Sequence, residues 1–157
     1  MPNTRFVEGD IPTETRTGFV AEAAIVFGSA VERGTDPLNQ VKTLVSGAFF
    51  GIALEDPGAG AVTAGQFGAA TQYDAKEEVK IARKGIVGLV PVAAPVTAGK
   101  KLAVVNLVGD SAFALGDLVD ETTAIGTTGT SVTIAGTEFQ STLAAAGNAT
   151  LQLNLPA

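Results

Sequence analysis

The hydrophobic positions of this chain fall in short runs separated by glycine, proline and polar residues. In the C-terminal segment 150–155, Leu alternates with Thr, Gln and Asn, as in a strand buried on one face. Residues 18–31, 41–54, 86–90 and 102–107 are rich in Val, Ile, Phe and Leu, which predicts further strands. Turn signals recur about every 8–12 residues, the spacing of sandwiches and barrels. The pattern therefore predicts about nine to eleven short strands.

One segment leaves the choice between helix and strand open. Asp74 precedes Glu77 by three residues, a spacing typical of a helix start, but residues 79–84 alternate as in an amphipathic strand. We favour a strand from residue 79 onward. At most one short helix is expected, in residues 74–82 or around 138–146.

The strongest core signal is the hexapeptide FFGIAL at 49–54, in which we expect Phe49, Ile52 and Leu54 to be buried. Residues 32–40 are predicted to form a polar loop, because they centre on the turn-forming run GTDP. The Thr- and Gly-rich segment 122–137 contains one further candidate strand around Val132 and Ile134.

The first 17 residues differ from the rest, because they combine turn-forming residues with charges of alternating sign. Two interpretations stay open: a frayed terminus, or an arm that becomes ordered on a partner. In the second interpretation the anchors are Arg5, Phe6, Val7 and Ile11. The expected fold is all-β: one β-barrel or jelly-roll-like sandwich over residues 18–157, preceded by an extended arm over residues 1–17.

Composition supports this fold class and removes many kinds of chemistry. The chain has 157 residues, enough for one domain, and Ala, Gly, Thr and Val make up just over half of it. It has no His, Cys or Trp. This excludes Ser-His-Asp and Cys-His catalysis, zinc fingers, thiol redox chemistry and disulfides. We therefore expect no enzyme, no cofactor and no metal site.

The charge of the chain is −6 overall but is unevenly distributed. Residues 76–101 carry six of the ten basic side chains, whereas residues 102–157 carry five acids and no base. If they lie close together, the basic side chains form a positive patch that faces a partner: Lys76, Lys80, Arg83, Lys84, Lys100 and Lys101. A protein partner and a solvated face are the main alternatives. Nucleic acid is disfavoured, because only Tyr73 offers an aromatic ring nearby.

Other motifs are missing or incomplete. The P-loop pattern fails on both sides of Gly99-Lys100, because Ala94 and Lys101 stand where Gly and Ser or Thr are needed. Adjacent acids occur in three pairs, but neighbouring residues on a strand point to opposite faces and cannot act together.

The N-terminus has no signal-peptide pattern, and no apolar run reaches the roughly 18–20 residues of a membrane helix. We therefore expect no membrane association.

At this point the sequence resembles the structural cement, or capsid decoration, proteins of tailed bacteriophages. The resemblance covers roughly residues 18–157 and rests on five segments that follow in the expected order. They are VSGAFFGIA (45–53), the strand 79–90 with KGIV at its centre, VTAGKKL (96–102), AIG (124–126) and ATLQLNL (149–155). The chain departs from the resemblance in the segments 32–40 and 122–137, which are longer than short family members need, and in the arm.

The resemblance implies a non-enzymatic virion protein that is made in the host cytoplasm and sits on the capsid exterior. The implied partners are the major capsid protein and further copies of the chain in a dimer or trimer, without nucleic acid or membrane. Its expected function is to cement neighbouring capsid subunits and stabilise the head. The alternative is another β-rich phage assembly protein, such as a head fibre or tail component.

Overall fold

The structure, a computed structural model, describes residues 5–7, 14–46, 48–56 and 71–156, and within them it contains thirteen strands and no helix. The all-β prediction is therefore confirmed. The strands are β1 (Arg5–Val7), β2 (Glu14–Ala21), β3 (Ile25–Val26), β4 (Ala30–Arg33), β5 (Gln40–Thr43), β6 (Gly51–Ala53), β7 (Gln72–Tyr73), β8 (Glu78–Val92), β9 (Leu102–Leu107), β10 (Leu118–Asp120), β11 (Thr130–Thr133), β12 (Thr137–Phe139) and β13 (Gly147–Asn154). None of the described segments is a helix long and apolar enough to cross a membrane.

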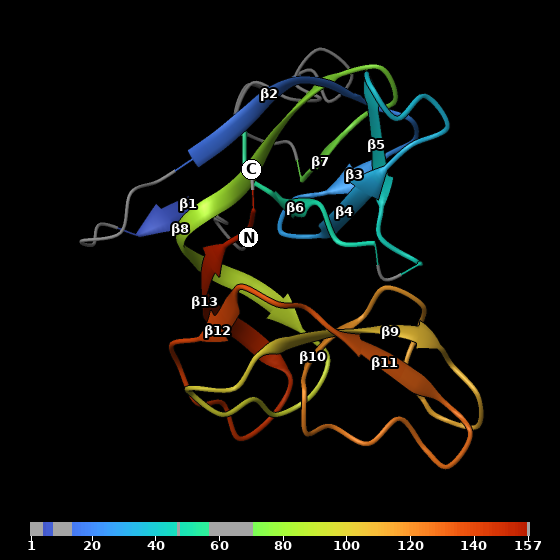
Figure 1. Ribbon diagram of the computed structural model, residues 1–157, viewed down its shortest axis with the longest axis vertical. Coiled ribbons are helices and arrows are strands. Elements are labelled where there is room, and N and C mark those ends of the chain that lie inside the picture. The colour runs from blue at the N-terminus through green and yellow to red at the C-terminus, as the bar shows by residue number, and fades with distance from the viewer. Residues whose placement is uncertain (1–4, 8–13, 47, 57–70, 157) are drawn as a thin grey trace.

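Five strands close into a barrel in the order β2-β5-β4-β6-β8, with β8 pairing again with β2 (upper half of Figure 1). All neighbours are antiparallel except β2 and β5, which are parallel. At the contact between β6 and β8, a Cβ on Gly51 would lie 2.5 Å from the carbonyl oxygen of Ala82. A glycine at this position therefore lets the two backbones approach closely enough to close the barrel.

The long strand β8 connects the barrel to the rest of the molecule. Its first part pairs with β2 and β6, and its second part pairs with β13, which in turn pairs with β12. The pairing with β13 shifts register between Ala149 and Leu151, opposite Leu89, which adopts a φ of 56°. This bulge lies in the half of β8 that leads into the lower part of Figure 1, where β10, β9 and β11 form a separate three-stranded sheet.

One hydrophobic cluster joins the two halves. It contains Ile52 of the barrel, Leu102 of β9 and Phe139 of β12, all of them fully buried. A second cluster fills the barrel around Ile81 and Tyr73. In β13 the positions buried against β8 alternate with more exposed ones, as predicted from the C-terminal segment. Because the largest cluster draws on both halves, they pack as one unit.

Three details of the sequence prediction are corrected. Neither segment that was allowed one short helix contains one: residues 74–82 are a turn followed by β8, in line with the favoured strand, and residues 138–146 are the end of β12 and irregular chain. Phe49 is half-buried at the edge of the core, whereas Ile52 and Leu54 are buried as expected. The loop predicted at 32–40 spans only residues 34–39, because β4 extends to Arg33 and β5 begins at Gln40.

Candidate functional site

Glu32 is a buried carboxylate on β4 that shapes the loop after β5. Its Oε2 atom accepts hydrogen bonds from the backbone N–H groups of Val45 (3.3 Å) and Ser46 (3.0 Å) and from the Ser46 hydroxyl (2.5 Å). Lys42 Nζ lies 3.5 Å from Oε1. Burial is the largest influence on the pKa of Glu32 and raises it, but the hydrogen bonds from Ser46 and Val45 together outweigh burial and hold the pKa below its usual value. Glu32 therefore positions a loop.

Phe50 is the centre of a cluster of aromatic rings and guanidinium groups. The guanidinium carbons of Arg33 and Arg83 lie 4.5 Å and 4.3 Å from its ring centroid, and Phe19 packs edge-on at 5.2 Å. Arg33 is exposed, and its Nη1 donates to the carbonyl oxygen of Pro37 at 2.5 Å. Stacking and this hydrogen bond hold the exposed guanidinium of Arg33 in one orientation.

Arg83, a member of the predicted basic patch, is directed into the molecule. It is 8% exposed, and it donates from Nη1 to the carbonyl oxygen of Phe50 and from Nη2 to that of Pro156, each at 2.5 Å. Its guanidinium thereby ties the barrel to the C-terminal end of the chain. In this structure Arg83 does not contribute to an exposed positive surface.

The other members of the predicted patch lie in two places. Lys76 belongs to the turn before β8, and Lys80 follows on β8 itself, 3.5 Å from a carboxylate oxygen of Asp56. Lys100 and Lys101 are exposed in the turn before β9, in the other half of the molecule (Figure 1). The half-exposed Lys84 lies on β8 between them. Lys76 and Lys80 therefore belong to the barrel half of the molecule, whereas Lys100 and Lys101 belong to the other half.

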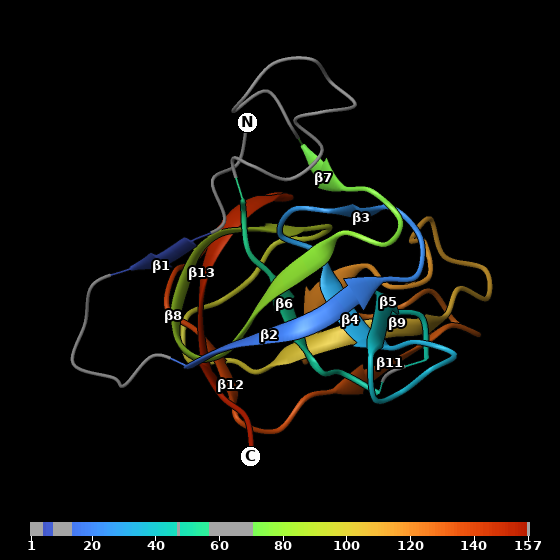
Figure 2. The same cartoon turned by 90° about the horizontal axis from the view of Figure 1, so that it is seen from above.

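The predicted arm is partly incorporated into the main sheet. Arg5, Phe6 and Val7 form β1, which pairs antiparallel with β8 through Val87 and its neighbours (Figure 2). Residues 14–17 belong to β2, which pairs with the preceding part of β8. Ile11 lies outside the described residues. One edge of residues 5–7 is therefore already paired with β8 of the same chain.

Asp120, from one of the three pairs of adjacent acids in the sequence, has a structural role. Asp120 is 2% exposed and accepts hydrogen bonds from the backbone N–H groups of Thr97 and Thr122 and from the Thr122 hydroxyl. Burial raises its pKa most strongly, but the hydrogen bonds, led by those from Thr122, lower it below the usual value overall. Across the described ranges no group of three or more acidic side chains is placed to hold a metal ion.

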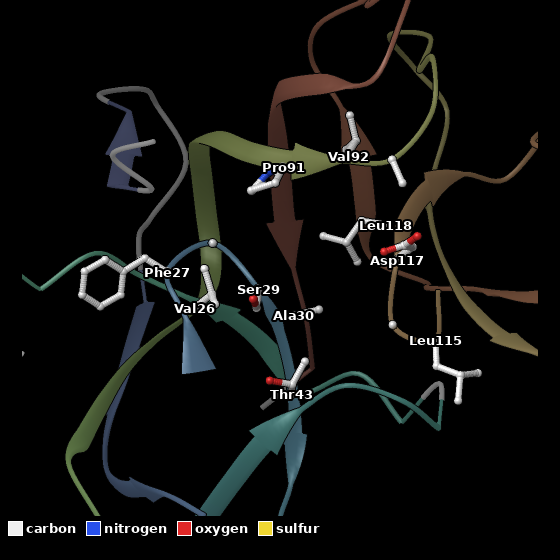
Figure 3. Close-up of a pocket in the computed structure, with 13 residues that line it drawn as sticks. Val26, Phe27, Ser29, Ala30, Thr43, Pro91, Val92, Leu115, Asp117 and Leu118 are labelled. Atoms are coloured by element: carbon white, nitrogen blue, oxygen red, sulfur yellow. The ribbon is translucent and has the colours of Figure 1, made fainter. Parts of the chain in front are cut away.

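Two grooves lie where the barrel meets the lower half. The first, which we call the Val26 groove, has a volume of about 400 Å³. Figure 3 shows Val26 of β3 and Thr43 of the barrel strand β5 on one side of it, and Pro91, Leu115 and Leu118 on the other. The exposed fractions of Val26 and Leu115 are 53% and 50%, so apolar side chains form part of its rim.

The second groove, the Phe49 groove, has a volume of about 600 Å³. One wall consists of Arg33 and the loop carrying Phe49, and the other of the end of β11 and the residues after it. Ile134 and Leu155, both of them buried, also line it. The groove therefore combines buried apolar side chains with one exposed, oriented cation.

The sequence prediction did not include Arg33 or either groove. Arg33 falls within the segment predicted as a polar loop, and its contact with Phe50 joins residues 17 positions apart, which the periodicity of the sequence cannot reveal. The adjacent phenylalanines were a usable signal, since two consecutive large apolar residues on a strand cannot both face one core.

Two comparisons with known proteins bear on this surface. Residues 4–154 match the model of a family described as structural cement protein (E217 gp24/Pam3 gp6). A search of curated proteins gave no match.

Proposed function

Because the chain belongs to the phage structural cement protein family, we propose that it binds the outer surface of a phage head and links neighbouring major capsid protein subunits there. The family match over residues 4–154 is the observation that carries this proposal. It gives the protein a structural, capsid-stabilising role in the virion. Binding to the outer surface and direct contact with the major capsid protein go beyond the family description and are our proposal.

The fold is suited to this role. A closed barrel has few exposed strand edges, and its core joins directly to the core of the lower half. The buried polar side chains of the described residues are hydrogen-bonded, which favours one rigid arrangement. A rigid body with separate contact surfaces can hold two subunits at a fixed distance. Many such contacts on one shell add together through multivalency, also when copies bind each other as dimers or trimers.

We place two contact regions at the positions that the sequence singled out. The first is the arm, with Arg5, Phe6, Val7 and Ile11 as anchors on the capsid protein. Deletion of residues 2–12 should weaken binding to shells while the unfolding midpoint changes little, since β1 contributes only three residues to the sheet. Unchanged binding by the folded, truncated protein would remove the arm from the proposal.

The second region is the exposed lysines, which we propose face acidic surfaces of the capsid protein or of another copy. These are Lys76 and Lys80 in one half, Lys84 on β8, and Lys100 and Lys101 in the other half. Substituting each pair by glutamine in turn tests which half of the molecule faces the shell. Substitution of a pair that lies at the interface should weaken binding and reduce the salt dependence of binding. Substitution of a solvated pair should change neither quantity.

The decisive experiment is the copy number of this protein in purified particles, measured by quantitative mass spectrometry against the major capsid protein. Hundreds of copies in a simple ratio to the capsid protein support cementing. A handful of copies would move the protein to a vertex, head fibre or tail. Labelling of intact particles with a reagent that does not cross the shell then separates an outer from an inner location.

A further inference from the structure

The strand β11 has one edge that no described strand occupies. It is the last strand of the sheet β10-β9-β11. One of its edges pairs with β9, and the opposite edge pairs with none of the described strands. The N–H of Ile134 donates to the carbonyl oxygen of Leu102, so the backbone groups of Ile134 point toward β9. Successive residues of an antiparallel strand point their N–H and C=O groups alternately toward and away from the neighbouring strand. The N–H and C=O of Thr133 therefore point away from β9, and Thr133 is exposed.

This edge lacks the features that usually prevent strand addition. Natural edge strands commonly carry lysine, proline or inward-pointing charges. Residues 127–137 have the sequence TTGTSVTIAGT, which contains neither a charge nor a proline. Backbone groups of an uncharged edge next to an apolar groove are a typical acceptor for an extended segment of another chain.

The Phe49 groove lies beside this edge. Residues 132–135 line it on the β11 side, and two of its lining side chains, Ile134 and Leu155, are apolar and buried. Phe49, half-buried, packs against the same core cluster from the opposite wall. An added strand would alternate its side chains, so that every second one enters the groove and contacts these three residues.

The exposed charge of the groove is positive. Arg33 lines it, is exposed, and has no carboxylate within ion-pair distance among the described residues. The other charged side chain of the lining, Glu32, is buried and already bound by Ser46 and Lys42. Stacking on Phe50 orients the Arg33 guanidinium, which suits it for a carboxylate.

We propose that the Phe49 groove and the open edge of β11 together bind an extended strand of the major capsid protein that carries apolar side chains at alternate positions and a carboxylate that pairs with Arg33. The inference rests on the proposed function for the identity of the partner. The charge of Arg33 selects an acidic segment, and the edge of β11 selects an extended one. A second copy of the chain is the competing occupant.

The test is hydrogen–deuterium exchange on the full-length protein, free and bound to purified phage shells that lack it. The backbone N–H of Thr133 should exchange at least tenfold more slowly in the bound state, because it becomes a donor in a new ladder. Unchanged exchange at residues 131–133 in shell-bound protein would overturn the strand addition while leaving the proposed function standing.

Variants provide the second readout. Thr133→Pro removes the outward N–H, and Arg33→Gln removes the charge while keeping a donor for Pro37. Each should weaken binding to shells roughly tenfold or more, measured by co-sedimentation. Arg16→Gln makes the same charge change on an exposed position of β2 and is the matched control. Unfolding midpoints identify any variant that fails to fold. If Thr133→Pro does not fold, the proposal is tested by hydrogen–deuterium exchange of the wild-type protein and by Arg33→Gln.

The outcomes separate the two proposals. Shell binding that is lost in Arg33→Gln but retained in Arg16→Gln supports the groove as the contact. Binding of the wild-type protein with no effect of either groove variant refutes the groove and keeps the cementing role. Absence of wild-type binding refutes both. Self-association that Thr133→Pro abolishes, seen by analytical ultracentrifugation without shells, would assign the edge to a second copy and overturn the capsid strand.

Discussion

Removal of the Glu32 carboxylate should destabilise the protein in a way that depends on what replaces it. Glu32 is 4% exposed, and a single oxygen, Oε2, receives all three of its hydrogen bonds from Val45 and Ser46. The other oxygen faces Lys42 at 3.5 Å. Glutamine can place its one carbonyl oxygen where Oε2 lies, whereas alanine offers no acceptor at all.

The magnitudes follow from these contacts. Hydrogen bonds to a charged group contribute about 1.5–3 kcal/mol each, and neutral ones about half as much. Solvent near the exposed Val45 and Ser46 compensates part of the loss. We expect Glu32→Ala to lower the free energy of unfolding by about 3 kcal/mol and Glu32→Gln by about 1 kcal/mol. For a chain of this length these values correspond to falls in Tm of roughly 6–12 °C and 2–4 °C.

The pH dependence provides an independent check of sign. The pKa of Glu32 is lowered on folding, so the ionised carboxylate contributes stability that is present at neutral pH and is lost as the pH falls through the folded pKa, below its usual value of 4.5. Urea unfolding at pH 7 and pH 3 should therefore show a smaller difference between wild type and Glu32→Gln at the lower pH.

The control is Glu138→Ala, which removes an exposed carboxylate from β12 and should change stability by less than about 0.5 kcal/mol. The reasoning is refuted if Glu32→Gln is as destabilising as Glu32→Ala at pH 7, because the acceptor geometry would then be irrelevant. It is also refuted if the wild-type advantage over Glu32→Gln grows in acid. Because the Ser46 loop leads into one wall of the Phe49 groove, Glu32→Ala should also weaken shell binding.

Three further changes test other parts of the structure. Tyr73→Phe removes a buried hydroxyl that donates to a carbonyl oxygen at 2.6 Å, and it should cost about 2 kcal/mol in urea unfolding. Gly51→Ala should cost at least about 3 kcal/mol, because the new methyl would lie 2.5 Å from the Ala82 carbonyl oxygen; a midpoint near that of the wild type would mean that the barrel closes differently. Asp110→Ala removes the acceptor for the Thr127 N–H at 2.7 Å and should speed hydrogen exchange there while leaving exchange in β8 unchanged.

The strands that the sequence predicts well are those whose pattern is local. The alternation at 150–155 appears as β13, where Leu151 and Leu153 are buried and Gln152 lies between them. The strand expected from residue 79 onward is β8. In both cases one face packs on the core and the period of two is visible without knowledge of the partner strand.

The helix at 74–82, the alternative to the favoured strand, is absent for a physical reason. Asp74 and Glu77 form only one of the two contacts expected of a helix start: the Asp74 N–H donates to Glu77 Oε2 at 2.6 Å, but the Glu77 N–H donates to the backbone carbonyl oxygen of Asp74 at 3.1 Å and not to its side chain. These bonds close a turn instead, because Tyr73 and Val79 on either side are both buried in the barrel cluster. Tertiary burial of the flanking strands therefore overrides the local capping signal.

The proposed binding surface could not be predicted from sequence patterns, because it depends on which strands have no neighbouring strand on one side. Closure of the barrel gives β4 and β6 partners on both sides, while the short sheet of the lower half ends at β11. Whether an uncharged strand such as residues 130–133 can add a strand from another chain depends on whether its second edge is already paired. The same holds for Arg33 at the end of β4, because its guanidinium is oriented by stacking on Phe50, a residue 17 positions away. A search for contact sites in related chains should therefore start from unpaired strand edges beside apolar grooves, since charge clusters along the sequence need not meet in the fold.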